Sequence, residues 1–128
     1  MKPISILLVD DSAVFLRTAK LFLEQLDGVE VVGTAYGGES GLRESLCLRP
    51  DIILMDLNMP DLHGLEVIPK LREALPATCI IALSMLDEDG FRRVSFAAGA
   101  HEFISKATMH ADLPSAIFRL GRRPEAAK

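Results

Sequence analysis

The sequence predicts an α/β domain in which helices cover both faces of a parallel sheet. Five short apolar runs alternate strictly with five longer amphipathic stretches along the 128 residues, an order typical of doubly wound sheets. Most of the runs are apolar throughout rather than at every second position, as expected for strands buried on both sides. With 49% hydrophobic residues, the chain can bury the core of one compact domain.

The apolar runs define the predicted strands, and the stretches that follow them define the predicted helices. The strands are Ile4–Val9, Val29–Ala35, Ile52–Met55, Cys79–Leu83 and Glu102–Ser105. The helices are Ser12–Leu26, Glu39–Leu48, Leu65–Leu75, Gly90–Ala98 and Leu113–Leu120. Residues 1–121 are therefore assigned to one domain, and residues 122–128 to a C-terminal tail or the start of a linker.

The first helix is the most clearly amphipathic. One face carries apolar residues at helical spacing, namely Phe15, Ala19, Phe22 and Leu26. Further apolar residues widen this face on both sides, namely Leu16, Leu23, Val14 and Leu21. Ser12 is the predicted N-cap. The pattern favours a broad contact with the core over a dimer surface.

Glycine and proline separate the remaining elements. Gly37-Gly38 lies between the second strand and the second helix, and Pro50 ends that helix. Pro76 separates the third helix from the fourth strand. Gly99 suits the position after the fourth helix, where a left-handed backbone is common.

Composition excludes several classes of function. Fourteen Lys and Arg against eighteen Asp and Glu give a net charge of −4, so the domain lacks the basic surface of a nucleic-acid binder. We interpret the basic residues Arg119, Arg122 and Arg123 as a solvated helix end. Cys47 and Cys79 are too few for a disulfide framework or a zinc site and are predicted to be small buried hydrophobes. Neither a signal peptide nor an apolar run of membrane-spanning length is present, so we expect a cytoplasmic protein without membrane contact.

Polar side chains follow four of the five predicted strands. Asp10 and Asp11 follow the first strand, Asp56 ends the third, Ser84 follows the fourth and Lys106 follows the fifth. In a parallel sheet these positions lie on one rim, where ligands of such folds bind. If strands one, three and four are neighbours, as in flavodoxin-like order, these groups converge on one pocket.

The three acids need a cation if they lie together. Clustered carboxylates repel one another, which raises the pKa of at least one of them unless a cation binds. A hard divalent ion, Mg²⁺ above all, is the natural partner of oxygen ligands. Lys106 adds a positive charge and Ser84 a hydroxyl donor, and this combination suits a phosphoryl group.

At these residues the sequence resembles the receiver domain of two-component response regulators. The matching segments are LLVDDS (Leu7–Ser12), IILMDLNMPDLHG (Ile52–Gly64), ALS (Ala82–Ser84) and AAGAHEFISK (Ala97–Lys106). The resemblance covers about residues 4–120 and implies a flavodoxin-like five-stranded sheet in the order 2-1-3-4-5 with five helices. It also implies a switch that promotes only its own phosphorylation and dephosphorylation, and not an enzyme acting on a separate substrate.

The resemblance implies a role for each residue of the rim. Asp56 would be the phosphoacceptor, and its donor a sensor histidine kinase or a histidine phosphotransfer protein. Asp10, Asp11, Asp56 and the backbone carbonyl of Asn58 would hold Mg²⁺, with Mn²⁺ as the alternative ion. Lys106 and Ser84 would each contact a phosphoryl oxygen.

Phe103 occupies the family's switch-aromatic position. The resemblance implies that Ser84 moves toward the phosphoryl group while Phe103 rotates inward, which would alter the face formed by the fourth helix, fifth strand and fifth helix. The alternative is that Phe103 is simply a core aromatic. That face would bind a downstream protein partner that the sequence does not name, and would mediate any homodimerisation on phosphorylation.

Some positions depart from the commonest family pattern. Ser84 replaces a more frequent threonine, and Met85 stands where a small residue is frequent, which would narrow access to the acceptor. Asn58 and Leu86 lie where the family tunes dephosphorylation. The three histidines, His63, His101 and His110, match no catalytic position and are predicted to be exposed loop residues.

Three other interpretations compete with a stand-alone receiver. The segments GVEVVGTAYGGESGL and KATMHADLPSAIFRL resemble receivers that precede a helix-turn-helix domain, so the chain could be the N-terminal part of a transcriptional regulator. The sequence favours the stand-alone receiver, because no second domain is present in it. A haloacid-dehalogenase-type phosphatase would need a second aspartate at the position of Asn58. A receiver-like module that no longer takes phosphate is disfavoured by the intact set of acids, Ser84 and Lys106.

Overall fold

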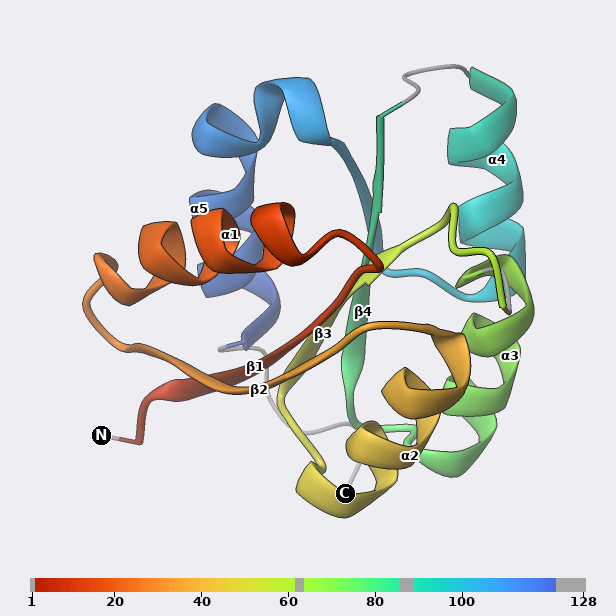
Figure 1. Cartoon of the computed structure of the whole chain (residues 1–128), viewed down its shortest axis with the longest axis horizontal. Helices are drawn as coiled ribbons and strands as arrows, with labels where there is room; N and C mark the ends of the chain where they lie inside the picture. The colour runs from red at the N-terminus through yellow and green to blue at the C-terminus, as the bar shows by residue number, and fades with distance from the viewer. Residues whose placement is uncertain (1, 62–63, 86–88, 122–128) are drawn as a thin grey trace.

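The computed structural model describes residues 2–61, 64–85 and 89–121, and its centre is one parallel sheet (Figure 1). The strands are β1 (Ile4–Val9), β2 (Val29–Ala35), β3 (Ile52–Asp56), β4 (Cys79–Ser84) and β5 (Glu102–Ser105). They pair in parallel in the order β2-β1-β3-β4-β5. The predicted fold class and strand order are confirmed.

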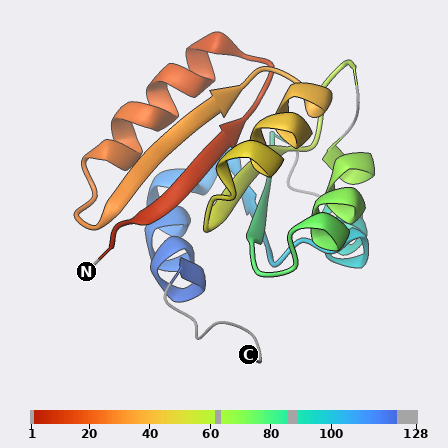
Figure 2. The same cartoon turned by 90° about the horizontal axis from the view of Figure 1, so that it is seen from below.

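Helices cover both faces of the sheet (Figures 1 and 2). One face is covered by α1 (Ala13–Glu24) and α5 (Met109–Gly121). The opposite face is covered by α2 (Gly38–Leu48), α3 (Gly64–Ala74) and α4 (Asp89–Ala98). A short 3-10 helix, η1 (Lys106–Thr108), connects β5 to α5. Each connection between parallel strands thus contains one helix, as this topology requires.

The sheet divides the interior into two cores. Successive residues of a strand point to opposite faces, so Ile6 and Leu8 of β1 join the core beneath α1 and α5. Leu7 and Val9 join the core on the other face. The strands β1, β3 and β4 are buried along nearly their whole length, which explains why their sequences are apolar at consecutive positions.

The buried stripe of α1 is narrower than the sequence predicts. Its buried residues are Leu16, Ala19 and Leu23, while Phe15, Phe22 and Leu26 pack against the same core at its margin. Val14 and Leu21 are 75% and 58% exposed, so the prediction that they contact the core is wrong. Both lie on the side of the helix turned away from its buried stripe. Ser12 is the N-cap as predicted, and its Oγ accepts a hydrogen bond from the Phe15 N–H at 3.2 Å.

Several element boundaries differ from the prediction in ways that affect the site. The strands β3 and β4 each extend by one residue to include Asp56 and Ser84. Helix α5 begins at Met109, because Met109 lies four residues before Leu113 on the same buried face and extends the apolar period. Gly99 follows α4 with a φ of +123°, in agreement with its predicted role.

Cys47 and two histidines correct the sequence interpretation. Cys79 is buried as predicted, but Cys47 is exposed, because α2 turns Gly41 and Ser45 toward the sheet and Cys47 falls on another side of the helix. His101 is only half-exposed, and its Nδ1 accepts a hydrogen bond from the Ile80 N–H at 3.0 Å. His110 is exposed but belongs to α5 rather than to a loop.

The described residues include no helix that is both long and apolar enough to cross a membrane. The predictions for His63 and Leu86, and for Arg122 and Arg123, fall outside the described residues.

Candidate functional site

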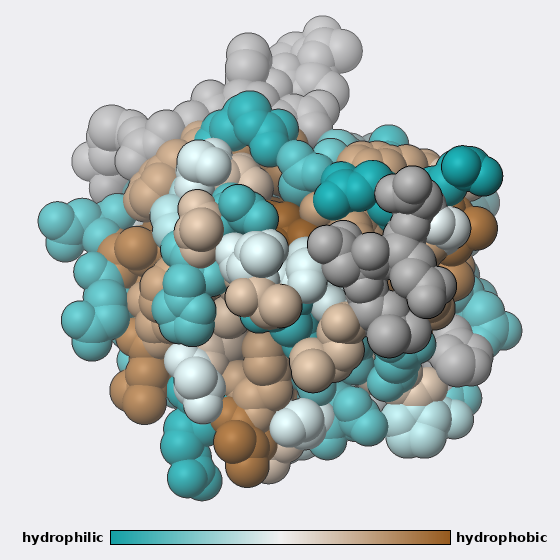
Figure 3. Space-filling model, turned by 90° about the horizontal axis from the view of Figure 1, so that it is seen from above, coloured by the Kyte–Doolittle hydropathy of each residue, from teal (hydrophilic) through white to brown (hydrophobic). Residues whose placement is uncertain are grey.

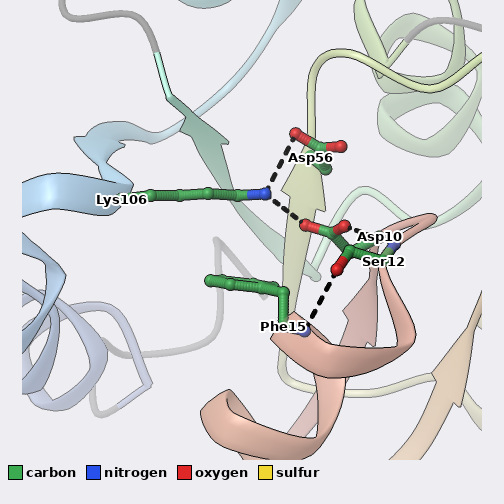
Figure 4. A network of polar contacts seen from close by, with 5 residues as sticks. All are labelled: Asp10, Ser12, Phe15, Asp56 and Lys106. Carbon is green, nitrogen blue, oxygen red and sulfur yellow. Dashed lines mark hydrogen bonds and ion pairs between the residues drawn. The ribbon is translucent and has the colours of Figure 1, made fainter.

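The sheet brings the predicted site residues to one edge. β1, β3, β4 and β5 are consecutive neighbours, and their ends lie within one residue of a common register, with Asp56 opposite Leu83 and Ser84 opposite Ser105. Asp10 follows β1 directly and Lys106 follows β5 directly. Because parallel strands end on the same side, residues from distant parts of the sequence meet there (Figure 4).

Lys106 is the cation of the cluster. Its Nζ donates a hydrogen bond to Asp10 Oδ2 at 2.6 Å and lies 3.6 Å from Asp56 Oδ1. The side chains of Asp10 and Asp56 are almost fully buried, and that of Lys106 is 11% exposed. Ion pairs this far from solvent are screened less than pairs at the surface, so Lys106 offsets part of the cost of burying both acids.

The backbone fixes Asp10 rigidly. Its N–H donates to the Ala35 carbonyl at 3.1 Å, which ties it to β2. Its Oδ1 accepts a hydrogen bond from the Ser12 N–H at 2.8 Å, and its Oδ2 accepts the hydrogen bond from Lys106 Nζ. Ser12 in turn caps α1. The Asp10 carboxylate is therefore oriented by the same turn that begins the first helix.

Asp56 is difficult to ionise. Burial, followed by the negative charge of Asp10, raises the pKa of its carboxyl to about 6. Asp11 adds to the increase in pKa, while Lys106 and a hydrogen bond from the Asn58 backbone N–H oppose it. One ammonium group is thus not enough to compensate three acids, and the site favours a further cation or a proton.

The donor set fits a hard divalent cation. Asp10, Asp11 and Asp56 each offer a carboxylate oxygen, and these atoms lie within 4.8 Å of one another. Asp11 is exposed while the other two acids are buried, so an ion could be held against the protein and still keep water ligands, as Mg²⁺ commonly does. The predicted metal-binding carboxylates are therefore close enough to act together.

The loop after Asp56 is held close to the end of β3. The Leu57 N–H donates to the Leu83 carbonyl at 3.0 Å, and the Gly64 N–H donates to the Leu57 carbonyl at 3.3 Å. A Cβ atom on Gly64 would lie 2.5 Å from the carbonyl oxygen of Asp56. Glycine is needed here because the backbone at the start of α3 passes so near the end of β3.

The two predicted switch residues are both buried. Ser84 is fully buried and Phe103 is 2% exposed. The Arg92 guanidinium of α4 lies 5.0 Å from the centroid of the Phe103 ring, a distance at which cation and ring attract. Met85, in contrast, is 71% exposed.

Two residues near the site were not recognised from the sequence. Phe15 was assigned to the core face of α1, but its ring also faces Lys106. Asp61, in the loop after β3, accepts hydrogen bonds from the Gly38 and Glu39 N–H groups at the start of α2. The sequence contains one indication of the Asp61 contact. The glycines at the start of α2 have no side chain that could cap the helix, so a cap from another segment is needed.

The surface around the carboxyl end of the sheet has a mixed character. Figure 3 views the molecule from above, the side toward which β4 runs, and hydrophilic and hydrophobic residues are interspersed over the coloured part of this face. Hydropathy alone therefore does not distinguish the site from the rest of this face.

Comparisons with known proteins identify response regulators and their receiver domains. The response regulator receiver domain model matches residues 6–118. Response regulator GacA of Pseudomonas viridiflava is 35% identical over 114 residues, which cover 89% of this chain and 53% of GacA. A protein-glutamate methylesterase/protein-glutamine glutaminase of Alkalilimnicola ehrlichii is 40% identical over 102 residues, covering 78% of this chain and 26% of that protein.

Solved structures agree with the sequence comparison. The response regulator domain of Thermotoga maritima CheB matches with a TM-score of 0.88 at 28% identity, covering 96% of this chain and 99% of that one. The chain spans about half the length of GacA and about a quarter of the methylesterase, so the shared part is the receiver and not the whole of those proteins. The family model accounts for nearly every described element, from β1 to α5, and the chain belongs to the response regulator receiver domain family.

Proposed function

We propose that Asp56 is the phosphoacceptor of this receiver. The observation that carries the proposal is the environment of its carboxylate, which is buried at the end of β3, 3.6 Å from the Lys106 ammonium and beside two further acids. The donor would be the phosphohistidine of a sensor histidine kinase or a histidine phosphotransfer protein. The protein is thus a switch located in the cytoplasm with its donor, and not an enzyme with a separate substrate.

In the proposed reaction, a carboxylate oxygen of Asp56 attacks the phosphorus atom of the donor. The P–N bond of the phosphohistidine breaks, its electron pair returns to the imidazole, and an acyl phosphate forms on Asp56. Asp56 must be ionised to attack, and a pKa of about 6 leaves most of it ionised above about pH 7. A carboxylate needs little further activation, so alignment and charge neutralisation carry most of the catalysis.

The remaining site residues would bind the phosphoryl group and its metal. We assign the metal ligands to Asp10, Asp11, Asp56 and the backbone carbonyl of Asn58, with Mg²⁺ as the ion and Mn²⁺ as its alternative. When bound, Mg²⁺ would supply positive charge that offsets the negative charge of the carboxylates and of the phosphoryl group. Lys106 contacts one phosphoryl oxygen with its ammonium group, and Ser84 contacts another with its hydroxyl.

Ser84 and Phe103 would transmit the change to the face formed by α4, β5 and α5. The support is their placement on paired strands, because Ala82 lies opposite Phe103 and Ser84 lies opposite Ser105. A movement of Ser84 toward the phosphoryl group would therefore pull on the strand that carries Phe103. Phe103 is buried in this structure and belongs to the core on the face of the sheet that α2, α3 and α4 cover.

The output of the switch has two candidates. In the first, residues 1–121 form a stand-alone receiver that signals through a downstream protein, or as a homodimer on phosphorylation, without contacting nucleic acid. In the second, the receiver is the N-terminal part of a longer DNA-binding regulator, and residues 122–128 begin a linker. The second is favoured by relatives such as GacA, about half of which lies beyond the shared region. The intact mass of the natural protein, isolated from its cells, distinguishes the two.

Phosphorylation by a small donor tests the central proposal. With Mg²⁺ and acetyl phosphate, the wild-type protein should gain one phosphoryl group that hydroxylamine removes, as an acyl phosphate requires. Asp56→Asn should abolish the mass increase, because an amide oxygen is a far weaker nucleophile, and Asp51→Asn serves as the matched control at an exposed acid. Full labelling of Asp56→Asn would refute the assignment.

A further inference from the structure

Lys106 has a third neighbour besides Asp10 and Asp56. Its Nζ lies 4.1 Å from the centroid of the Phe15 ring, and Figure 4 shows the ring alongside the extended lysine side chain. An ammonium group over an aromatic face is attracted by the quadrupole of the ring. The ring thus occupies a side of the ammonium that water would otherwise take, in agreement with the low exposure of the Lys106 side chain.

One short segment supplies both the anion and the ring that contact Lys106. Asp10 accepts the Lys106 hydrogen bond and is tied to the Ser12 N–H. The Ser12 hydroxyl in turn accepts a hydrogen bond from the Phe15 N–H. These bonds fix the first turn of α1, so the distance between the Asp10 carboxylate and the Phe15 side chain is set by the backbone.

The Phe15 ring packs against the core as well as against Lys106. It is half-buried and packs against the core between α1 and the sheet. Any large apolar side chain could fill that place in the core, but an aliphatic one would offer no electron-rich face to the ammonium. The aromatic ring therefore offers Lys106 a contact that apolar packing of α1 alone would not supply.

We propose that Phe15 is a positioning residue for phosphoryl transfer, acting through Lys106. The inference rests on the proposed function of Asp56. A lysine has a long stem with many rotamers, and its ammonium must lie beside Asp56 when the phosphoryl group arrives. The Phe15 ring restricts the stem to orientations in which Nζ faces the acceptor, and it leaves that side of the ammonium free for a phosphoryl oxygen.

The rate of labelling by acetyl phosphate, with Mg²⁺ at saturation, tests this role in the full chain. A small donor needs no docking surface on α1, so a change in rate does not report partner binding. Phe15→Leu should slow labelling of Asp56 about threefold to tenfold, the range expected for loss of a partly buried cation–π contact. Phe15→Tyr keeps the ring face and should restore most of the rate.

Two controls separate positioning from packing. Phe22→Leu removes another half-buried phenylalanine of α1, whose ring contacts His110, and should leave the rate unchanged. In a Lys106→Met background, Phe15→Leu should cause no further loss, because the group that it positions is gone. A second contact-specific readout is the NMR shift of the Lys106 ε-methylene protons, which the ring current should move upfield in the wild type and which Phe15→Leu should return to ordinary values.

Several results would overturn the proposal. These are equal rates for wild type and Phe15→Leu, an equal loss in Phe15→Tyr, or an undiminished loss in the Lys106→Met background. If Phe15→Leu does not fold, the wild type alone still tests the proposal. An ordinary NMR shift of its Lys106 ε-methylene protons would then be sufficient to reject the contact with the ring. A wild type that takes no label at all would instead refute the phosphoacceptor assignment, so the two failures are distinguishable.

Discussion

Asp56 combines a functional need for charge with a position that disfavours charge. Its carboxylate must be ionised for the proposed attack on phosphorus, yet burial and Asp10 raise its pKa from 3.8 to about 6. Lys106 and the Asn58 N–H keep this increase from being larger. The Asp56 carboxyl therefore changes its charge near pH 6, and the proposed reactivity and the effect of Asp56 on stability depend on the same equilibrium.

The sign of the pH effect follows from this shift. The folded protein binds the Asp56 proton more tightly than the unfolded chain does. Asp56 therefore makes its full contribution to the free energy of unfolding below about pH 4, where the carboxyl is protonated in both states. It is lost as the pH rises through about 6, where the folded-state carboxyl ionises. Asp56→Asn cannot ionise and escapes this loss.

We therefore predict that Asp56→Asn gains stability over the wild type as the pH rises. In buffer with chelator, the difference in unfolding free energy should increase between about pH 4 and pH 7 by on the order of 2 kcal/mol. Urea unfolding at a series of pH values measures it. A difference that is constant across this range would show that Asp56 has an ordinary acidity in the folded protein.

At the scale of elements, the loop after β3 connects Asp56 to α2. Asp61 accepts hydrogen bonds from the Gly38 and Glu39 N–H groups at 3.0 and 3.3 Å, so a side chain distant in sequence caps the helix. A negative charge at this end also interacts favourably with the helix dipole. The position of α2 is thus tied to the loop that starts at Asp56.

Asp61→Ala should destabilise the domain by about 1 kcal/mol, the usual effect of losing a helix cap. Asp61→Asn keeps an oxygen acceptor and should lose less. Chemical denaturation of the three proteins compares them, and hydrogen exchange should show the added opening in the first turn of α2. Unchanged exchange there in Asp61→Ala would mean that the loop does not hold the helix.

At the scale of the whole molecule, the sequence predicts well what periodicity and topology determine. Uniformly apolar strands required helices on both faces, and parallel strands ending at one edge brought Asp10, Asp56 and Lys106 together. The exposure of Val14 and Leu21 was not predictable in the same way. Periodicity shows that a helix has an apolar stripe, but the width of the buried part depends on how α1 and α5 pack over the sheet.

Contacts between side chains from distant elements were the least predictable part of the site. Phe15 was placed correctly on the inner side of α1, but its contact with Lys106 depends on the exact course of η1 after β5. The same applies to Arg92 over Phe103, where α4 meets β5. Sequence patterns identify the element to which a residue belongs, but the packing of the elements determines which residue of another element it contacts.

The whole domain should respond to a divalent cation, because three acids are concentrated at one edge of the sheet. Three carboxylates with ligand atoms within 4.8 Å of one another share a single nearby ammonium, so an ion that binds only the folded state stabilises it by mass action.

At tenfold the dissociation constant, Mg²⁺ should add about 1.4 kcal/mol to the free energy of unfolding, which corresponds to roughly 3–6 °C in Tm for a domain of this size. Thermal unfolding with MgCl₂ measures the shift, and NaCl of equal ionic strength provides the control for screening. Asp11→Asn should reduce the shift without unfolding the protein, since Asp11 is exposed. An equal shift with NaCl, or a full shift in Asp11→Asn, would contradict a metal site built on these three acids.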